Sequence, residues 1–233
     1  MLLIFGSLAY DRIMDYPGVF TDHVVGGKEH SLNVSFLIES VHESFGWTAA
    51  NISYSIAILG EKPTILARAG LDFAPYKTWL THAGAECSLI EEDHALKTPF
   101  ASIMTDKHDN QITAFYPGAM KTMLKAPEKA LAVASFVVIS PGNPEDMRLL
   151  PTLCREKNIP FMFDPGQQVT ALSADDLKNG IDGAKVLIAN DYEMTLIREK
   201  TGLSEADTLE RAEIIVVIWL SCLSVMMEAK GVL

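Results

Sequence analysis

The sequence predicts an α/β fold in which a parallel sheet is covered by helices on both faces. Short β-branched runs alternate along the chain with polar or glycine-bearing segments and then with helical patterns. Strands that are apolar on both faces are typical of parallel sheets whose two faces are buried. The 233 residues, 48% hydrophobic and 21% charged, suffice for one large α/β domain or two small ones. We therefore expect a sizeable core.

Each predicted strand is a short apolar run that ends near a glycine or a polar residue. In chain order the strands are LLIFGS (2–7), PTILARAG (63–70), SFVVISPG (135–142), IPFMFDPG (159–166) and KVLIAND (185–191). The helices between and after them are expected at 48–59, 73–83, 144–157, 191–201 and 204–212. Ligands of such sheets bind outside the carboxyl ends of the strands, so the polar residues directly after the strands are the candidates for a site.

Two segments interrupt this alternation, at residues 16–42 and 97–118. Apolar and polar residues alternate in them, and the second contains the turn DKHDN. This pattern is typical of antiparallel hairpins. We therefore expect a small β-sheet appended to the α/β body.

Charge and cysteine content exclude several classes of partner. The net charge is −11, from 30 acidic and 19 basic residues, whereas nucleic acids and anionic membranes are bound mainly through clustered basic side chains. The cysteines are odd in number and form no C-x-x-C pair, so neither a zinc site nor a disulfide framework is indicated. The longest uncharged apolar stretch, 214–227, is shorter than the roughly 20 residues of a spanning helix. We expect a cytoplasmic protein with no nucleic-acid or membrane partner.

Asp11 follows the first strand in the segment GSLAYDRIMDYPG and is expected to lie in a loop. A dinucleotide fold would need G-x-G-x-x-G at this turn, but Gly6 stands alone, so an NAD-dependent oxidoreductase is disfavoured. An ionised carboxylate offers two acceptor oxygens, so Asp11 could bind two hydroxyls of a sugar. A solvated loop aspartate is the alternative.

The segment GWTAAN, residues 46–51, opens a predicted helix with small residues. The first turn of a helix has unpaired N–H groups, and small residues let a ligand approach them. Asn51 would then present a donor and an acceptor to that ligand. The alternative is that Thr48 caps an ordinary, tightly packed helix.

Two later segments also carry candidate ligand-binding groups. ANDYEMTLI contains Asn190 and Glu193 one turn apart, and such a carboxylate could hold a hydrated Mg²⁺; a helix cap is the alternative. FDPGQQ turns sharply and presents Gln167 and Gln168, whose amides suit a heterocyclic base or sugar hydroxyls. An ordinary polar turn is the alternative there.

Two aromatic residues, Phe100 and Phe115, lie on the two arms of the predicted hairpin. They could stack on a base if the hairpin folds over the sheet edge. Packing within the hairpin is the commoner role of such residues. The chain contains no G-x-S-x-G or H-E-x-x-H pattern, which makes a hydrolase less favoured.

Taken in this order, the segments resemble the PfkB (ribokinase-like) family of sugar and nucleoside kinases, and most closely its bacterial adenosine kinase branch. The resemblance runs from residue 1 to about residue 217. Besides the segments above, it is carried by LNVSFLIES, AGLDFAPYKTWL, ITAFYPGAM, NPEDM and NDYEMTLIREKTGLSEAD. It implies a three-layer α/β/α sandwich with a β-sheet lid. It also implies phosphoryl transfer from ATP–Mg²⁺ to the 5′-hydroxyl of a nucleoside such as adenosine.

The same resemblance assigns roles by position. The residues that it implies around the ribose are Ser7, Asp11, Gly46 and Asn51, with Ser35 from the lid. The residues implied around the base are Phe100 and Phe115, which would sandwich it, with Gln167 and Gln168 nearby. Asn190 and Glu193 would order Mg²⁺ and phosphate-bound water, with Glu193 as the metal ligand. The lid of this branch commonly joins two subunits, which implies a homodimer.

The chain departs from the family pattern at two places. The family's catalytic base is an aspartate in a late G-A-G-D element, which this sequence does not contain, and residues 218–233 diverge from the pattern. We therefore expect one incomplete ribokinase-like domain over 1–233. The alternative to a kinase is a remnant or nucleoside-binding module without phosphoryl transfer.

Trp47 stands where the family carries a second glycine. A left-handed backbone at this position would cost a non-glycine residue about 1–2 kcal/mol. The indole would also fill space beside the expected ligand, so changing Trp47 to Gly is expected to improve nucleoside binding.

Overall fold

The computed structural model describes residues 1–23, 34–212, 214–218 and 225–229. Within these residues the main sheet has the strand order β12-β11-β10-β9-β8-β1-β4-β5. Its strands are β1 (Leu2–Phe5), β4 (Thr64–Ala69), β5 (Ile90–Glu92), β8 (Phe136–Ile139), β9 (Phe161–Phe163), β10 (Val186–Asn190), β11 (Ile214–Ile218) and β12 (Val225–Ala229). Neighbouring strands are parallel except β11 and β12, which are antiparallel. The parallel sheet is as the sequence predicts.

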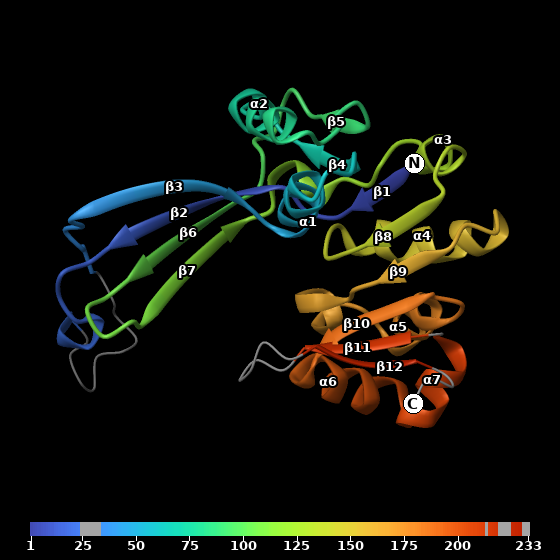
Figure 1. The fold of residues 1–233 in the computed structure, drawn as a ribbon. Helices are drawn as coiled ribbons and strands as arrows, with labels where there is room; N and C mark the ends of the chain where they lie inside the picture. Colours follow the sequence, from blue (N-terminus) through green and yellow to red (C-terminus); the bar gives the residue numbers. More distant parts are fainter. Residues whose placement is uncertain (24–33, 213, 219–224, 230–233) are drawn as a thin grey trace.

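Helices cover both faces of this sheet, and Figure 1 shows the arrangement. On one face lie α1 (Thr48–Ile58) and α2 (Ala74–Ala83), and on the other lie α3 (Pro127–Leu131), α4 (Pro144–Glu156), α5 (Ala174–Ile181) and α6 (Asp191–Thr201). A further helix, α7 (Glu205–Arg211), precedes β11. Successive residues of a strand point to opposite faces, so Leu3 and Phe5 belong to the core on the side of α3 to α6, whereas Ile4 belongs to the core on the side of α1 and α2.

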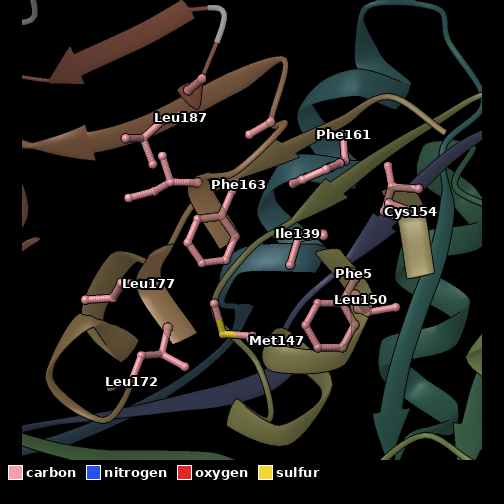
Figure 2. Packing of buried hydrophobic residues seen from close by; sticks show 14 of the residues in the cluster. Phe5, Ile139, Met147, Leu150, Cys154, Phe161, Phe163, Leu172, Leu177 and Leu187 are labelled. Atoms are coloured by element: carbon pink, nitrogen blue, oxygen red, sulfur yellow. The ribbon is translucent and has the colours of Figure 1, made fainter. Parts of the chain in front are cut away.

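The larger core lies between the sheet and the helices α4 to α6 (Figure 2). Phe163 of β9 and Phe161 are fully buried there, together with Met147 and Leu150 of α4. Strands with apolar residues on both faces contribute to both cores, and this explains their continuous apolar sequence.

The second sheet has the order β3-β2-β6-β7 and projects from the carboxyl edge of the main sheet (Figure 1). We call it the lid; its strands are β2 (Ala9–Asp15), β3 (Ser40–Gly46), β6 (Phe100–Thr105) and β7 (Gln111–Tyr116). β2 pairs antiparallel to β3 and parallel to β6, and β6 pairs antiparallel to β7. The hairpin predicted within 97–118 is therefore present as β6 and β7.

The antiparallel hairpin predicted at 16–42 is displaced from that segment, because β2 ends at Asp15 and β3 begins at Ser40; residues 24–33 of the segment lie outside the described residues. Only three residues separate the end of β1 from the start of β2, which occupies Ala9–Asp15, so Asp11 lies in a strand and not in the predicted loop. The strand was not predicted because neither face of the lid is covered as the main sheet is. The successive residues Asp11 and Arg12 are therefore both only partly buried. Charged residues on both faces hide the alternation by which a half-buried strand is recognised.

The described residues contain no helix long and apolar enough to cross a membrane. The apolar stretch 214–227 begins as the strand β11 and reaches into β12; its middle, 219–224, lies outside the described residues. The first part of this stretch is therefore a strand of the main sheet.

Candidate ribose and phosphate site

The carboxyl ends of β1, β8, β9 and β10 lie along one edge of the main sheet, and the lid leaves from the same edge. Parallel strands place their following loops side by side. Most of the sequence-predicted site residues belong to these loops or to the lid strands. The site is described below from β1 outward.

Ser7 ties the end of β1 to two neighbouring segments. It is 3% exposed, and its N–H donates to the carbonyl oxygen of Pro141 at 2.9 Å and to Thr48 Oγ1 at 3.2 Å. The Ser7 and Thr48 hydroxyls are 3.1 Å apart, and Thr48 Oγ1 donates to the Pro141 carbonyl at 2.8 Å. A Cβ on Gly6 would lie 2.2 Å from Ser140 Oγ, so only glycine permits this close approach. Ser7 therefore holds the start of α1 against the sheet edge.

Asp11 and Gly46 are diagonal neighbours on one face of the β2–β3 ladder, where Gly46 pairs with Ala9 and Asp11 pairs with Ser44. A Cβ on Gly46 would lie 2.6 Å from Asp11 Oδ2, so a side chain there would displace the carboxylate. Tyr76 donates its hydroxyl to the Gly46 carbonyl and is fully buried. Burial raises the pKa of this Tyr76 hydroxyl above its usual range. The structure thus brings Asp11 and Gly46 together, and the buried Tyr76 supports the Gly46 backbone.

Trp47 contacts both Asp11 and the lid strand β7. Its Nε1–H donates to Asp11 Oδ1 at 2.9 Å, and its ring stacks on Phe115 of β7 with centroids 4.6 Å apart and planes 18° apart. The backbone angles are φ 76° and ψ 174°, a region occupied almost only by glycine and costing another residue about 1–3 kcal/mol. The positive φ considered from the sequence is therefore present, and the indole lies on the carboxylate that was expected to bind sugar hydroxyls.

Asn51 lies one turn into α1 and is exposed. Its N–H donates to the Trp47 carbonyl at 2.9 Å, the first bond of the helix, so Trp47 and not Thr48 is the N-cap residue. The Asn51 side chain makes no hydrogen bond to any other residue that the structure describes, and its amide is open to a ligand.

Phe100 and Phe115 lie on opposite faces of the lid, and this corrects the predicted sandwich. Phe100 pairs with Tyr116, and the next residue along, Ala101, pairs with Phe115. Directly paired residues share a face whereas successive residues alternate. Phe115 shares its face with Asp11. Phe100 lies beneath the guanidinium of Arg12, whose Cζ is 4.5 Å from the centre of the Phe100 ring. The two rings do not face each other in this structure.

A cavity of about 540 Å³ opens beside Phe115 and is also lined by Gln168 and Asn143. Gln168 Nε2 donates to the Gly142 carbonyl at 2.9 Å, which leaves its oxygen available. Asn143 is committed to structure, since Oδ1 accepts the Glu145 N–H at 2.9 Å and Nδ2 donates to the Met120 carbonyl at 2.8 Å. Gln167, on the same 3₁₀ turn as Gln168, is exposed and does not line this cavity.

Asn190 and Glu193 form a capping box at the start of α6. Asn190 Oδ1 accepts the Glu193 N–H at 2.7 Å, and Glu193 Oε2 accepts the Asn190 N–H at 2.8 Å. The cap considered as the alternative is therefore present. It does not exclude a second role, because a carboxylate has further lone pairs for a cation.

Asp164, at the end of β9, is a further candidate that the sequence prediction did not assign. Burial, followed by the negative charge of Glu193, raises its pKa to about 7. Two neighbouring carboxylates of this kind suit a hard divalent cation, which takes oxygen ligands. No group of three or more His, Cys, Asp or Glu side chains in the described part of the chain could hold a metal. Water or phosphate would therefore have to supply the remaining ligands. The signal for Asp164 was its place directly after a strand.

Ser35 is not brought to this site. The β2–β3 pairing runs from Ala9 and Gly46, near the body, to Asp15 and Ser40, far from it, and Ser35 precedes that far end. It is exposed, and its neighbour Phe36 packs on Tyr16 at 4.9 Å between ring centres.

The fold and the edge-of-sheet site together define the class of protein. The chain belongs to the pfkB family of carbohydrate kinases, whose model matches residues 1–222. The predicted family and the ribokinase-like α/β fold with a second small sheet are confirmed.

Nucleoside kinases are among the similar proteins. The Methanocaldococcus jannaschii nucleoside kinase is 31% identical over 194 residues, 79% of this chain and 61% of that protein. Burkholderia thailandensis nucleoside kinase in complex with inosine has 29% identity and a TM-score of 0.82, covering 99% of this chain and 73% of that one. The M. jannaschii enzyme's structure, an archaeal member of the ribokinase family, gives 27% identity and a TM-score of 0.82, covering 99% and 74%. This chain spans about three-fifths of the length of the curated relatives it matches.

Proposed function

We propose that the protein is a nucleoside kinase that transfers a phosphoryl group from ATP to the 5′-hydroxyl of a purine nucleoside, with adenosine as the first candidate. The observation that supports this most is the close approach of the Asp11 carboxylate to the Gly46 backbone, beside an open cavity at the carboxyl edge of the sheet. It combines a carboxylate for hydroxyls with a backbone that a sugar can approach. The Burkholderia relative binds inosine, so inosine is the second candidate.

Binding of the nucleoside follows from the groups available. The ribose would contact Asp11 and the exposed amide of Asn51 and would pass over the Gly46 backbone. Ser7 would act through the helix start that it holds. The base would enter the cavity beside Phe115, where the free oxygen of Gln168 can accept a hydrogen bond from an amino or ring N–H group.

Phosphoryl transfer requires charge stabilisation near the transferred group. Mg²⁺ would neutralise charge on the phosphate oxygens, held by Glu193 with Asp164 beside it, while Asn190 keeps Glu193 oriented through the capping box. The residues that the resemblance assigns include no base for the 5′-hydroxyl, because the sequence contains no G-A-G-D segment. Nucleoside binding without phosphoryl transfer is the second candidate function of the residues described here.

The two candidates are distinguished by incubating the purified chain with adenosine and ATP–Mg²⁺, measuring AMP by chromatography and adenosine binding by calorimetry. Binding together with AMP formation indicates the kinase, and binding alone indicates the binding module. Asp11→Asn should weaken adenosine binding about tenfold, as expected for a hydrogen bond to a charged group. Asp15→Asn, on the same strand and face but at the far end of the lid, is the matched control. Adenosine binding that Asp11→Asn leaves unchanged would remove Asp11 from the site.

We also propose that the protein is a homodimer joined through the lid. Four apolar side chains form one row across the lid on the face that carries Arg12: Val41, Met14, Met104 and Ile112. Val41 is 63% exposed and Ile112 is 50% exposed. An exposed row of apolar side chains on one face of the lid suits burial against a second copy of the chain.

A further inference from the structure

Trp47 takes one of the two oxygens with which Asp11 could bind a ligand. Its Nε1–H donates to Oδ1 at 2.9 Å, while Oδ2 lies on the side of Gly46. An indole N–H is a donor only, so it presents to the carboxylate the same group that a sugar hydroxyl would present. The chain thus supplies from within itself one hydrogen bond that a bound diol would otherwise make.

We propose that Trp47 is a specificity-determining residue, which competes with one hydroxyl of the bound ribose for Asp11 and thereby lowers the preference of the site for ribonucleosides over deoxyribonucleosides. This inference rests on the proposed function, because it takes the ligand to be a nucleoside. It concerns how many ribose hydroxyls can donate a full hydrogen bond to Asp11 at one time.

The position of the indole is set from two sides. Trp47 is the N-cap residue of α1, which belongs to the body, and its ring stacks on Phe115, which belongs to the lid. Its backbone stays in a region that strongly favours glycine. The contacts with Asp11 and Phe115 are the interactions that offset this cost. If the indole N–H leaves the Asp11 carboxylate, the chain therefore loses a contact that offsets the backbone strain at Trp47.

The consequence differs between two kinds of ligand. A nucleoside that places one ribose hydroxyl on each oxygen of Asp11 meets the indole N–H at Oδ1, so the two donors share that oxygen and the hydroxyl gains a weaker hydrogen bond there. A nucleoside that lacks one of these hydroxyls needs a single oxygen, and the indole stays in place. Removing the N–H while keeping an aromatic ring should therefore strengthen ribonucleoside binding selectively.

The test measures binding of adenosine, 2′-deoxyadenosine and 3′-deoxyadenosine by calorimetry to the wild-type chain and to Trp47→Phe. Phenylalanine keeps a ring to stack on Phe115 and lacks the donor. We expect about a tenfold gain in adenosine affinity, the size of one hydrogen bond to a charged group, and less than a threefold change for at least one deoxynucleoside. That deoxynucleoside identifies the competing hydroxyl. Equal changes for all three ligands, or none for adenosine, would overturn the proposal.

Trp47→Gly provides a second variant in which both the donor and the backbone strain are absent. It should show the same selective gain for adenosine, on top of any uniform change from the lost stacking. Circular dichroism confirms that each variant is folded. If folded wild-type, Trp47→Phe and Trp47→Gly chains all fail to bind any of the nucleosides, the proposed function itself is wrong. Binding without selectivity overturns only the role of Trp47.

A readout that does not depend on nucleosides tests the contact directly. The chain has three tryptophans, and the indole N–H signal that disappears from the ¹H–¹⁵N spectrum of Trp47→Phe belongs to Trp47. Asp11→Asn should shift that signal in the free protein, because the acceptor loses its charge, whereas Asp15→Asn should not. A signal that Asp11→Asn leaves in place would show that the competing bond is absent.

Discussion

Asp146 is a buried carboxylate near the candidate site, and its neighbours compensate only part of the cost of burying its charge. It is 2% exposed, and both of its oxygens lie 3.2 Å from the Leu124 N–H. Arg68 nearby is directed elsewhere, with Nη1 2.8 Å from Glu91 and Nη2 3.4 Å from Asp93. Its Nε is buried and has no hydrogen-bond partner among the described residues. Burial, together with the negative charge of Glu91, raises the pKa of Asp146 to about 6.

This raised pKa predicts how stability depends on pH. Between the unfolded value near 4 and the folded value of about 6, the folded state binds more protons than the unfolded state. The contribution of Asp146 to stability therefore falls as pH rises through this window and stays low above it. Asp146→Asn should remove that slope and gain about 1–3 kcal/mol at pH 7 relative to the wild type.

Urea unfolding at several pH values between 4 and 8 measures this effect. Asp175→Asn is the control, since Asp175 is exposed in the first turn of α5, and it should leave the pH profile of the wild type unchanged. If Asp146→Asn and the wild type have parallel profiles between pH 4 and 6, Asp146 does not titrate as described.

At the scale of the element, α6 shows how one side chain can serve both a helix and a ligand. Glu193 closes the capping box with Asn190 through Oε2, and glutamine at this position can still accept that N–H bond. Glu193→Gln should therefore change the free energy of unfolding by less than about 0.5 kcal/mol. The charge that would hold the metal is lost, so Mn²⁺ binding measured by electron paramagnetic resonance should weaken at least about tenfold.

Asn190→Ala is the complementary variant in this helix. It removes the side-chain acceptor of the cap and should cost about 1 kcal/mol of stability. If Glu193→Gln instead loses as much stability as Asn190→Ala while Mn²⁺ binding is unchanged, Glu193 is a capping residue and nothing more.

The helix α5 was missed by the sequence prediction although its start carries a local signal. Ser173 and Asp176 form a capping box, in which Ser173 Oγ accepts the Asp176 N–H at 3.2 Å and Asp176 Oδ2 accepts the Ser173 N–H at 2.8 Å. The S-x-x-D spacing indicates this box. Asn179 and Gly180, both poor helix formers, weakened the pattern, and burial of Leu177 and Ile181 against the core compensates for them.

At the scale of the whole molecule, the lid is the part whose surface predicts assembly. The row of Val41, Met14, Met104 and Ile112 is proposed to pack on a second copy. Ile112→Lys should shift the protein from dimer to monomer, because a buried, unpaired ammonium in an apolar interface is costly. Sedimentation velocity over a range of protein concentrations measures the shift.

Thr113→Lys is the matched control for this experiment. Thr113 is the next residue of β7, is also exposed and points to the other face of the lid. It should leave the dimer intact. A wild-type protein that sediments as a monomer at every concentration, or a dimer that Ile112→Lys does not weaken, would contradict assembly through this row.

Several features of this molecule followed from local patterns in the sequence. The parallel sheet, the helices at Thr48–Ile58 and Asp191–Thr201, the hairpin of β6 and β7 and the family were all predicted. Each is written in residues that are close in sequence: apolar runs, helical periodicity and caps spaced three residues apart. These signals are local because the hydrogen bonds and side-chain directions that produce them repeat within one element.

The arrangement of the candidate site was decided by the tertiary structure. The register of β6 and β7 places Phe100 and Phe115 on opposite faces, and a shift of one residue would have reversed this. The contact of Trp47 with Asp11 joins residues from different elements, as does the charge coupling of Glu193 to Asp164. Strand register and the approach of distant segments depend on how the whole core packs. For this reason the sequence by itself determined which strand ends and helix starts form the sheet edge, and only the packed fold decided which of their residues lie together.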